Sequence, residues 1–79
     1  MKVIVNVYLK DGILDPQGKA TEHALGVMGF EEVKEVRIGK QIILDLNESN
    51  EAKALEEADA MAKKLLVNQV VEDYKIEIA

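Results

Sequence analysis

Few side chains in this sequence have the type and spacing that catalysis or metal binding requires. The only histidine, His23, stands in a segment of helical pattern, with no second ligand or base at helical or loop spacing. The hydroxyls of Thr21 and Ser49 also have no base near them in the pattern. Carboxylates stand in adjacent pairs that are typical of solvated edges: Glu31-Glu32, Glu56-Glu57 and Glu72-Asp73. We therefore expect no catalytic, metal or cofactor site on this chain.

The segment Asp15-Pro16-Gln17-Gly18-Lys19 is the one place where a bound anion has to be considered. Asp15 suits a helix N-cap and Pro16 the first helical position, and free amides at a helix start can bind a phosphate. Asp15 already fills the capping role, however, and its charge would repel a phosphate. Gly18 falls in the first turn, where glycine lowers helix stability. We therefore expect Gly18 to serve packing or a partner contact that leaves no room for a β-carbon.

Hydrophobic periodicity predicts four strands and two helices that would position these residues. The strands are residues 2–9, 35–38, 41–46 and 70–78, with a tight turn at Gly39-Lys40 between the second and the third. The helices are residues 16 to about 28, ended by Gly29, and residues 51–66. Each helix has one apolar stripe: Ala20, Ala24, Val27 and Met28 in the first, and Leu55, Ala58, Met61, Ala62 and Leu65 in the second. Each stripe is expected to pack on the sheet.

The order β-α-β-β-α-β indicates an α+β fold, a two-layer sandwich. It is the order of a ferredoxin-like split β-α-β domain. We expect one domain over residues 1–79, with a four-stranded, mainly antiparallel sheet and both helices on one of its faces. A chain of 79 residues buries only a small core, so association with other chains would add stability.

The sheet face away from the helices is not fully polar. Alternation of side chains places Ile4, Tyr8 and Ile43 on that face. A cluster of apolar side chains on one sheet face indicates a buried contact. We therefore expect the chain to self-associate through Ile4, Tyr8 and Ile43, as a homodimer or a higher oligomer.

Composition excludes several classes of partner. The formal net charge is −5, whereas a nucleic-acid binder needs a basic face. The sequence has no cysteine, which excludes disulfides and thiolate zinc sites. No apolar run approaches the roughly 20 residues of a membrane span, and the first residues read as a strand and not as a signal peptide. We expect a cytoplasmic protein with neither nucleic-acid nor membrane partners.

Three segments resemble the PurS family in order and spacing: DGILDPQGKATEHAL, VKEVRIGKQIILDL and KKLLVNQVVEDYKIEI. Each segment alone is a weak signal, but together they are specific and cover nearly the whole chain. One departure is Gln69, which stands where the family usually has proline after the asparagine. This departure is expected to loosen the turn before the last strand without affecting the assignment.

The resemblance implies a non-catalytic small subunit of phosphoribosylformylglycinamidine (FGAM) synthase, in purine biosynthesis. In this family's complex, a PurL-type synthetase binds ATP and substrate, and a PurQ-type glutaminase releases ammonia. The small subunit is expected to bridge these two chains and to support the transfer of ammonia. The complex is expected to use ATP, magnesium and glutamine, none of them bound by this chain itself.

An ACT-like regulatory domain that senses a small molecule is the alternative from another class. Such domains bind effectors at dimer interfaces near the first strand–helix loop, the place that LKDGILDPQG occupies here. A sensor should bind an amino acid or a similar ligand as an isolated dimer. A bridging subunit should bind only its partner chains.

The predicted topology brings the three family segments to one end of the domain. The first strand ends there, the Gly39-Lys40 turn returns there, and the second helix ends there. Because no requirement of the fold forces specific motifs onto one end, we expect a partner surface at this place. Its candidate residues come from all three segments: Asp15, Pro16, Gly18, Arg37, Gly39, Lys40 and Asn68.

Overall fold

The computed structural model describes every residue from Met1 to Ala79 and contains three strands and two main helices. The strands are β1 (Lys2–Leu9), β2 (Gly39–Asp45) and β3 (Glu72–Ile78). The helices are α1 (Pro16–Val27) and α2 (Glu51–Met61), and α2 continues into one π-helical turn, η1 (Ala62–Leu66). None of these helices combines the length and the apolar character that crossing a bilayer requires.

The three strands form one antiparallel sheet in the order β2-β1-β3. Alternation along β1 places Val3, Val5 and Val7 on one face, and all three are buried. The other face carries Ile4, paired with Ile43 of β2 on one side and Glu77 of β3 on the other. The predicted first strand is confirmed in both its bounds and its two faces.

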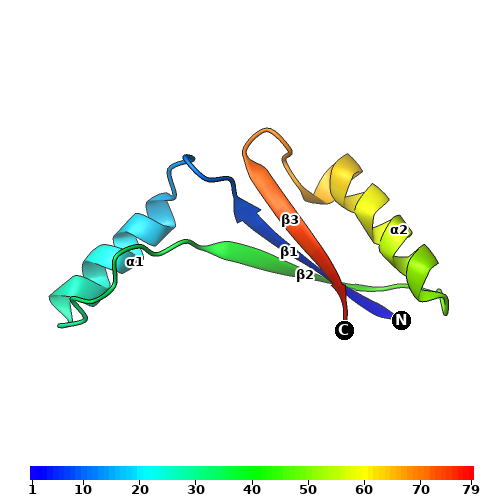
Figure 1. Cartoon of the computed structure of the whole chain (residues 1–79), viewed down its shortest axis with the longest axis horizontal. Coiled ribbons are helices and arrows are strands. Elements are labelled where there is room, and N and C mark those ends of the chain that lie inside the picture. Colours follow the sequence, from blue (N-terminus) through cyan, green and yellow to red (C-terminus); the bar gives the residue numbers. More distant parts are fainter.

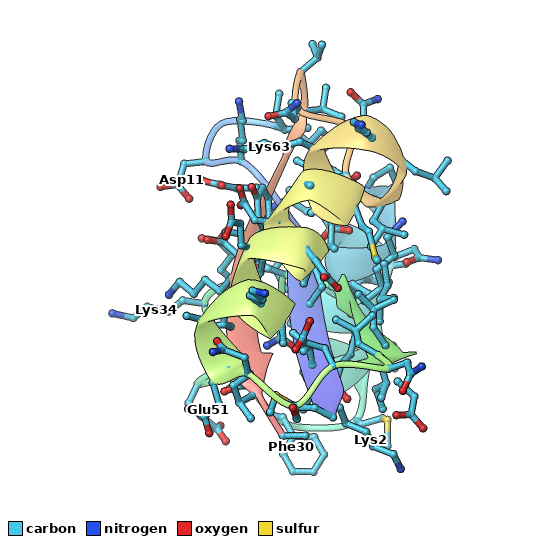
Figure 2. All side chains as sticks on the ribbon, turned by 90° about the vertical axis from the view of Figure 1, so that its right-hand side faces the viewer. Lys2, Asp11, Phe30, Lys34, Glu51 and Lys63 are labelled. Atoms are coloured by element: carbon cyan, nitrogen blue, oxygen red, sulfur yellow. The ribbon has the colours of Figure 1, made fainter.

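Helix α2 covers the valine face of β1 through small side chains. Ala54, Ala58 and Ala62 recur every four residues and are fully buried, so the helix approaches the sheet closely. Figure 2 shows α2 directly in front of the strands. The predicted stripe on this helix is wrong at Leu65, which is 84% exposed, because η1 widens the last turn and turns Leu66 inward instead.

The second of the four predicted strands, residues 35–38, is not a strand. This segment is extended but pairs with no other strand, and β2 begins only at Gly39, which pairs with Tyr8 at the end of β1. The predicted turn at Gly39-Lys40 is therefore wrong as well, and among the glycines only Gly12 and Gly29 have positive φ. A β-branched sequence favours an extended backbone, but pairing also requires a neighbouring strand, and here the segment runs back along α1.

The prediction that both helices cover one face of the sheet is also wrong. Helix α1 leaves on the side opposite to α2 and diverges from the sheet as an arm (Figure 1). Packing between elements joins β1 to β2 and β3, and α2 to β1 and β3, without a substantial share from α1. The molecule is correspondingly elongated, with extents of 48 × 25 × 14 Å.

The arm leaves most of its apolar stripe in water. Val27 is 76% exposed and Met28 70% exposed, and Ala20 and Ala24 are exposed as well. Only 9 of 79 residues in the whole chain are buried, and the core consists of valines and alanines. So small a core, beside so much exposed apolar surface, favours association with another chain.

Candidate functional site

The three segments that carry the family resemblance meet at the end of the sheet where β1 finishes. The chain leaves β1 for α1 there, enters β2 at Gly39, and enters β3 after the turn that follows η1. Figure 2 shows Asp11 and Lys63 at this end, with Lys2 and Glu51 at the other. We call this end, residues 9–18, 36–40 and 67–71, the convergent end.

Asp15 joins the two segments that connect the arm to the sheet. Its side chain is buried, and Oδ1 accepts a hydrogen bond from the Gly18 amide at 2.8 Å. Oδ2 accepts a hydrogen bond from the Ile38 amide at 2.6 Å. These two hydrogen bonds lower the pKa of the Asp15 carboxyl, and the bond from Ile38 has the larger effect. Asp15 therefore caps α1, as predicted, and also fixes the residue before β2, which the sequence did not reveal.

Gly18 is a glycine because the returning chain passes too close for any side chain. A β-carbon there would collide with the backbone carbonyl oxygen of Val36, and a backbone atom cannot turn aside. Gly18 is itself buried under that segment. The close approach expected from the sequence is thus made by the chain's own backbone at Val36.

Arg37 ties the returning segment to the loop after β1. Nη1 donates to the carbonyl oxygen of Ile13 at 2.9 Å, and Nη2 donates to that of Lys10 at 3.2 Å. Its Nε also lies 3.8 Å from a carboxylate oxygen of Glu35. The guanidinium therefore has a structural task at the convergent end, and its role toward a partner stays a prediction.

Gly39 and Lys40 open β2 beside an exposed hollow of about 300 Å³. A β-carbon on Gly39 would lie 2.6 Å from the carbonyl oxygen of Val7, so this glycine permits close strand pairing. Lys40 makes no ion pair and is exposed. The hollow is lined by residues of four segments, among them Tyr8, Pro16, Gln17, Lys40 and Glu72. Lys40 is thus the free charge among the predicted partner residues.

Asn68 organises the turn between η1 and β3. Its side-chain Oδ1 accepts a hydrogen bond from the backbone amide of Val70 at 3.1 Å. The backbone amide of Asn68 donates a hydrogen bond to Glu72 Oε1 at 2.8 Å. Lys10 joins this turn to the end of β1, because Nζ donates to the carbonyl oxygen of Gln69 at 2.7 Å. The Gln69 side chain also donates to the Lys63 carbonyl at 3.3 Å. These four hydrogen bonds hold the turn in place. The expectation that Gln69 loosens the turn stays a prediction.

The open face of the sheet carries the three residues predicted to mediate self-association. Ile4 and Ile43 are directly paired, and Ile43 is 59% exposed. Tyr8 lies on the same face at the end of β1. Between them, Asn6 accepts a hydrogen bond from Gln41 and donates one to Glu77, each at 3.2 Å. The face is therefore partly apolar and has no covering element within the chain.

Asp59, Lys63 and Tyr74 form an interacting group that the sequence did not indicate, because Tyr74 lies on a different element from the other two. Asp59 of α2 accepts a hydrogen bond from the Tyr74 hydroxyl at 2.5 Å and pairs with Lys63 at 2.9 Å. The hydrogen bond that Tyr74 donates to Asp59 raises the pKa of Tyr74. The same bond lowers the pKa of Asp59, and the hydrogen bond from Lys63 lowers it further, by a smaller amount. These contacts fasten α2 to β3 and form no nucleophile–base arrangement.

No three histidine, cysteine, aspartate or glutamate side chains stand close enough to hold a metal ion. His23 is exposed on the arm and makes no hydrogen bond. The convergent end instead combines a braced backbone, a free lysine and an open hollow, features that suit recognition of another chain.

Comparisons with known proteins point in one direction. A family model described as PurS: phosphoribosylformylglycinamidine (FGAM) synthase matches residues 2–79. The PurS subunit of phosphoribosylformylglycinamidine synthase from Methanocaldococcus jannaschii is 43% identical over 77 residues, 98% of this chain and 93% of that protein. The subunit of the same name from Bacillus subtilis is 46% identical over 81 residues, 98% of this chain and 90% of that protein.

Solved structures share the whole shape, including the arm. The crystal structure of Methanocaldococcus jannaschii PurS has a TM-score of 0.87 at 45% identity and covers 96% of this chain and 92% of its own. A chain in the structure of PurLQS from Thermotoga maritima also has a TM-score of 0.87, at 34% identity, covering 96% of this chain and 93% of its own. The extended arm is therefore part of the fold that these proteins have in common.

Proposed function

The chain belongs to the PurS family and is a subunit of FGAM synthase in purine biosynthesis, and we propose that it acts there without catalytic groups of its own. We propose further that it bridges a PurL-type synthetase and a PurQ-type glutaminase and so supports ammonia transfer between them. The likeness of the full chain to a chain of the PurLQS complex is the observation that carries this proposal. ATP, magnesium and glutamine would be bound by the other two subunits, in the cytoplasm.

The convergent end is the surface that we assign to these partners. Its backbone is braced by Asp15, Arg37 and Asn68, so a partner would meet a surface that is already in order. Pro16 and Lys40 are exposed beside the hollow. Arg37 and Gly18 would contribute indirectly, since their contacts set the position of the segment that carries Gly39 and Lys40.

Self-association belongs to the same proposal. The open face carries Ile4, Tyr8 and Ile43, and the arm projects on that side of the sheet with Val27 and Met28 exposed. A second copy would cover both surfaces at once, which would also compensate for the small core. We therefore propose a homodimer, or a higher oligomer built on one, as the working form of the chain.

The ACT-like sensor is not proposed, since the family match covers residues 2–79 and no feature of the convergent end selects an amino-acid ligand. The two functions can still be separated directly. The purified chain should show no heat of binding with amino acids in calorimetry but should co-purify with PurL-type and PurQ-type chains.

Reconstitution tests the proposed function. The chain, a PurL-type synthetase and a PurQ-type glutaminase should together form FGAM from glutamine, ATP and formylglycinamide ribonucleotide. Omission of this chain should abolish the glutamine-dependent reaction while the synthetase still accepts free ammonia. Turnover by the isolated chain, removed by a point substitution within it, would contradict the non-catalytic role.

A further inference from the structure

The returning segment, residues 33–38, has the sequence of a strand and a backbone that is almost free of partners. Figure 1 shows it running from the arm into β2 without reversing direction. The amide of Ile38, which donates to Asp15 Oδ2, makes the only hydrogen bond of this backbone. The other amides and all the carbonyl groups of the segment have no partner within the chain. A backbone in this state can pair with a strand from outside.

The free backbone groups face away from the contacts that the segment makes with the arm. Neighbouring residues of an extended backbone direct their amide and carbonyl groups to opposite sides. The Ile38 amide faces Asp15, and the Val36 carbonyl faces Gly18. The backbone groups of the residue between them, Arg37, therefore point to the other side. A strand can pair along that side and leave the hydrogen bond to Asp15 in place.

Strand β2 offers a free edge for such pairing. It stands at one border of the sheet, whose order is β2-β1-β3. Residues 41–44 at its centre include no charged side chain, and Ile43 is 59% exposed. Strand β3, at the other border, carries exposed charges at Asp73, Lys75 and Glu77, which is the usual protection of a strand edge. β2 is therefore the border that is open to a further strand.

The surplus surface of the chain matches what a stable dimer buries. Its radius of gyration is 15.8 Å, whereas a compact domain of this length has about 12 Å. Its accessible surface is 5800 Å², against roughly 4800 Å² for a compact protein of 8.8 kDa. The excess is about 1000 Å² per chain, or about 2000 Å² for two chains, which is the upper end of standard-size stable interfaces.

A second copy of this chain satisfies the returning segment and β2 at the same time. The two form one continuous run, residues 33–45. Two such runs, laid antiparallel about a two-fold axis near Gly39, place each returning segment beside the β2 of the other copy. The net charge of the chain does not oppose this contact locally, because the run carries three basic and two acidic side chains: Lys34, Arg37, Lys40, Glu35 and Asp45.

We infer that two copies of this chain join by exchanging the returning segment, which becomes a fourth strand at the β2 edge of the other copy. The sequence predicted a strand at residues 35–38 and a turn at Gly39-Lys40. In this arrangement the turn stays open and the strand is formed between chains, as in domain swapping. The inference rests on the proposed self-association and adds the elements that form it.

Disulfide bridges between single-cysteine variants test the pairing, since the chain has no cysteine of its own. Glu35→Cys is co-expressed with Gln41→Cys, Ile43→Cys or Asp45→Cys, and the purified pairs are oxidised and run on non-reducing gels. Because each chain carries one cysteine, any bridge joins two chains. The three positions on β2 share one face of the sheet, so the position that bridges reveals the register of the pairing.

The control pairs Glu35→Cys with Lys75→Cys, which lies on the same sheet face at the β3 border. We expect one of the three β2 positions to bridge at least about tenfold faster than this control, because a disulfide forms only where two β-carbons are close. A dimer packed face to face through the open face, without exchange of the returning segment, would give β2 no such advantage over β3.

A longer hinge should prevent the exchange. Insertion of Gly-Asn-Gly between Ile38 and Gly39 lets the returning segment fold back onto the β2 of its own chain. Light scattering should then show association weakened by at least about tenfold, with helix content by circular dichroism retained. The same insertion between Asn47 and Glu48, in the turn before α2, is the control that should associate normally.

The inference and the proposed function fail in different ways. The inference alone is overturned if the unchanged chain associates but no β2 position bridges to Glu35→Cys faster than Lys75→Cys does. It is also overturned if the variant with the longer hinge is folded and associates as the unchanged chain does. An unchanged chain that stays monomeric would overturn the proposed self-association, and the inference with it. A dimer with the expected bridges that does not support FGAM formation would contradict the proposed function and leave the inference standing.

Discussion

The Ile38 amide lies 2.6 Å from Oδ2 of Asp15, so the residue that begins the arm also fixes the chain where it returns to the sheet. Both connections of the arm thus depend on one buried carboxylate. Asp15→Asn should lower the urea midpoint of unfolding, because the amide group replaces one of two accepting oxygens with a donor. Asp11→Asn, at an exposed position a few residues earlier, should leave the midpoint unchanged. Equal midpoints for the two variants would contradict this role.

Acid should weaken the fold through two carboxylates, Asp15 and Asp59. The pKa values of Asp15 and Asp59 are both lowered in the folded chain by hydrogen bonds. Their contribution to stability is complete above the unfolded value of about 3.9 and is lost as the pH falls through the folded values. Urea midpoints should therefore be flat near neutral pH and fall on acidification below about pH 4. Asp15→Asn should reduce that fall, and an identical pH profile for this variant would count against it.

Two glycines of α1 provide a matched pair. Gly18→Ala should destabilise the chain by about 1–3 kcal/mol, because the added carbon meets the Val36 carbonyl and the returning segment has to move. Gly26→Ala should stabilise it by about 0.5–1 kcal/mol, because nothing lies within 4 Å of its β-carbon and alanine favours a helix. Both free energies of unfolding are measured at one protein concentration, since association stabilises the folded state. Stabilisation by both alanines would show that the close approach is not maintained in solution.

Self-association through the open face is tested by charge. Ile43→Lys or Tyr8→Lys should weaken association by at least about tenfold, because a desolvated lysine would replace an apolar contact. Helix content by circular dichroism should be retained, since Ile43 is already 59% exposed and contributes little to the core. Glu56→Lys, exposed on α2 across the sheet, is the control that should associate normally. An unchanged chain that is monomeric at tens of micromolar would refute the prediction.

The sequence was informative where structure is local and failed where it depends on distant neighbours. The alternation of Val3, Val5 and Val7 and the cap at Asp15 are determined by adjacent residues, and both were predicted correctly. Residues 35–38 have the composition of a strand, yet pairing depends on a neighbour that the chain does not supply. The outward turn of Leu65 depends on one π-helical turn, which no periodicity indicates.

The candidate site shows the same division. Convergence of the three segments followed from the order of elements, although the second segment reaches that end as the start of β2 and not as a turn. The internal ties of Arg37 to Ile13 and Lys10 could not be foreseen, because they join residues more than twenty positions apart. Some of the residues predicted to contact a partner, Asp15, Arg37 and Asn68, instead make hydrogen bonds within the chain. These bonds hold in place the surface that a partner would meet.

Lys40 allows the partner role of the convergent end to be tested without disturbing that bracing. Lys40 is exposed and makes no ion pair. A side chain at Gly18, in contrast, would collide with the Val36 carbonyl and displace the segment that returns from the arm to the sheet. Lys40→Glu should leave stability within about 0.5 kcal/mol and self-association intact, but lower glutamine-dependent FGAM formation in the reconstituted complex severalfold, because a charge-matched contact becomes repulsive. Lys53→Glu makes the same charge change at an exposed position in the first turn of α2, which begins at Glu51, and Figure 2 shows Glu51 at the end opposite to Asp11 and Lys63. This control should have no effect on activity. Added salt should partly restore the Lys40 variant, since screening weakens the repulsion. If both variants support full activity, the partners bind elsewhere on the chain, and the assignment of the convergent end is wrong.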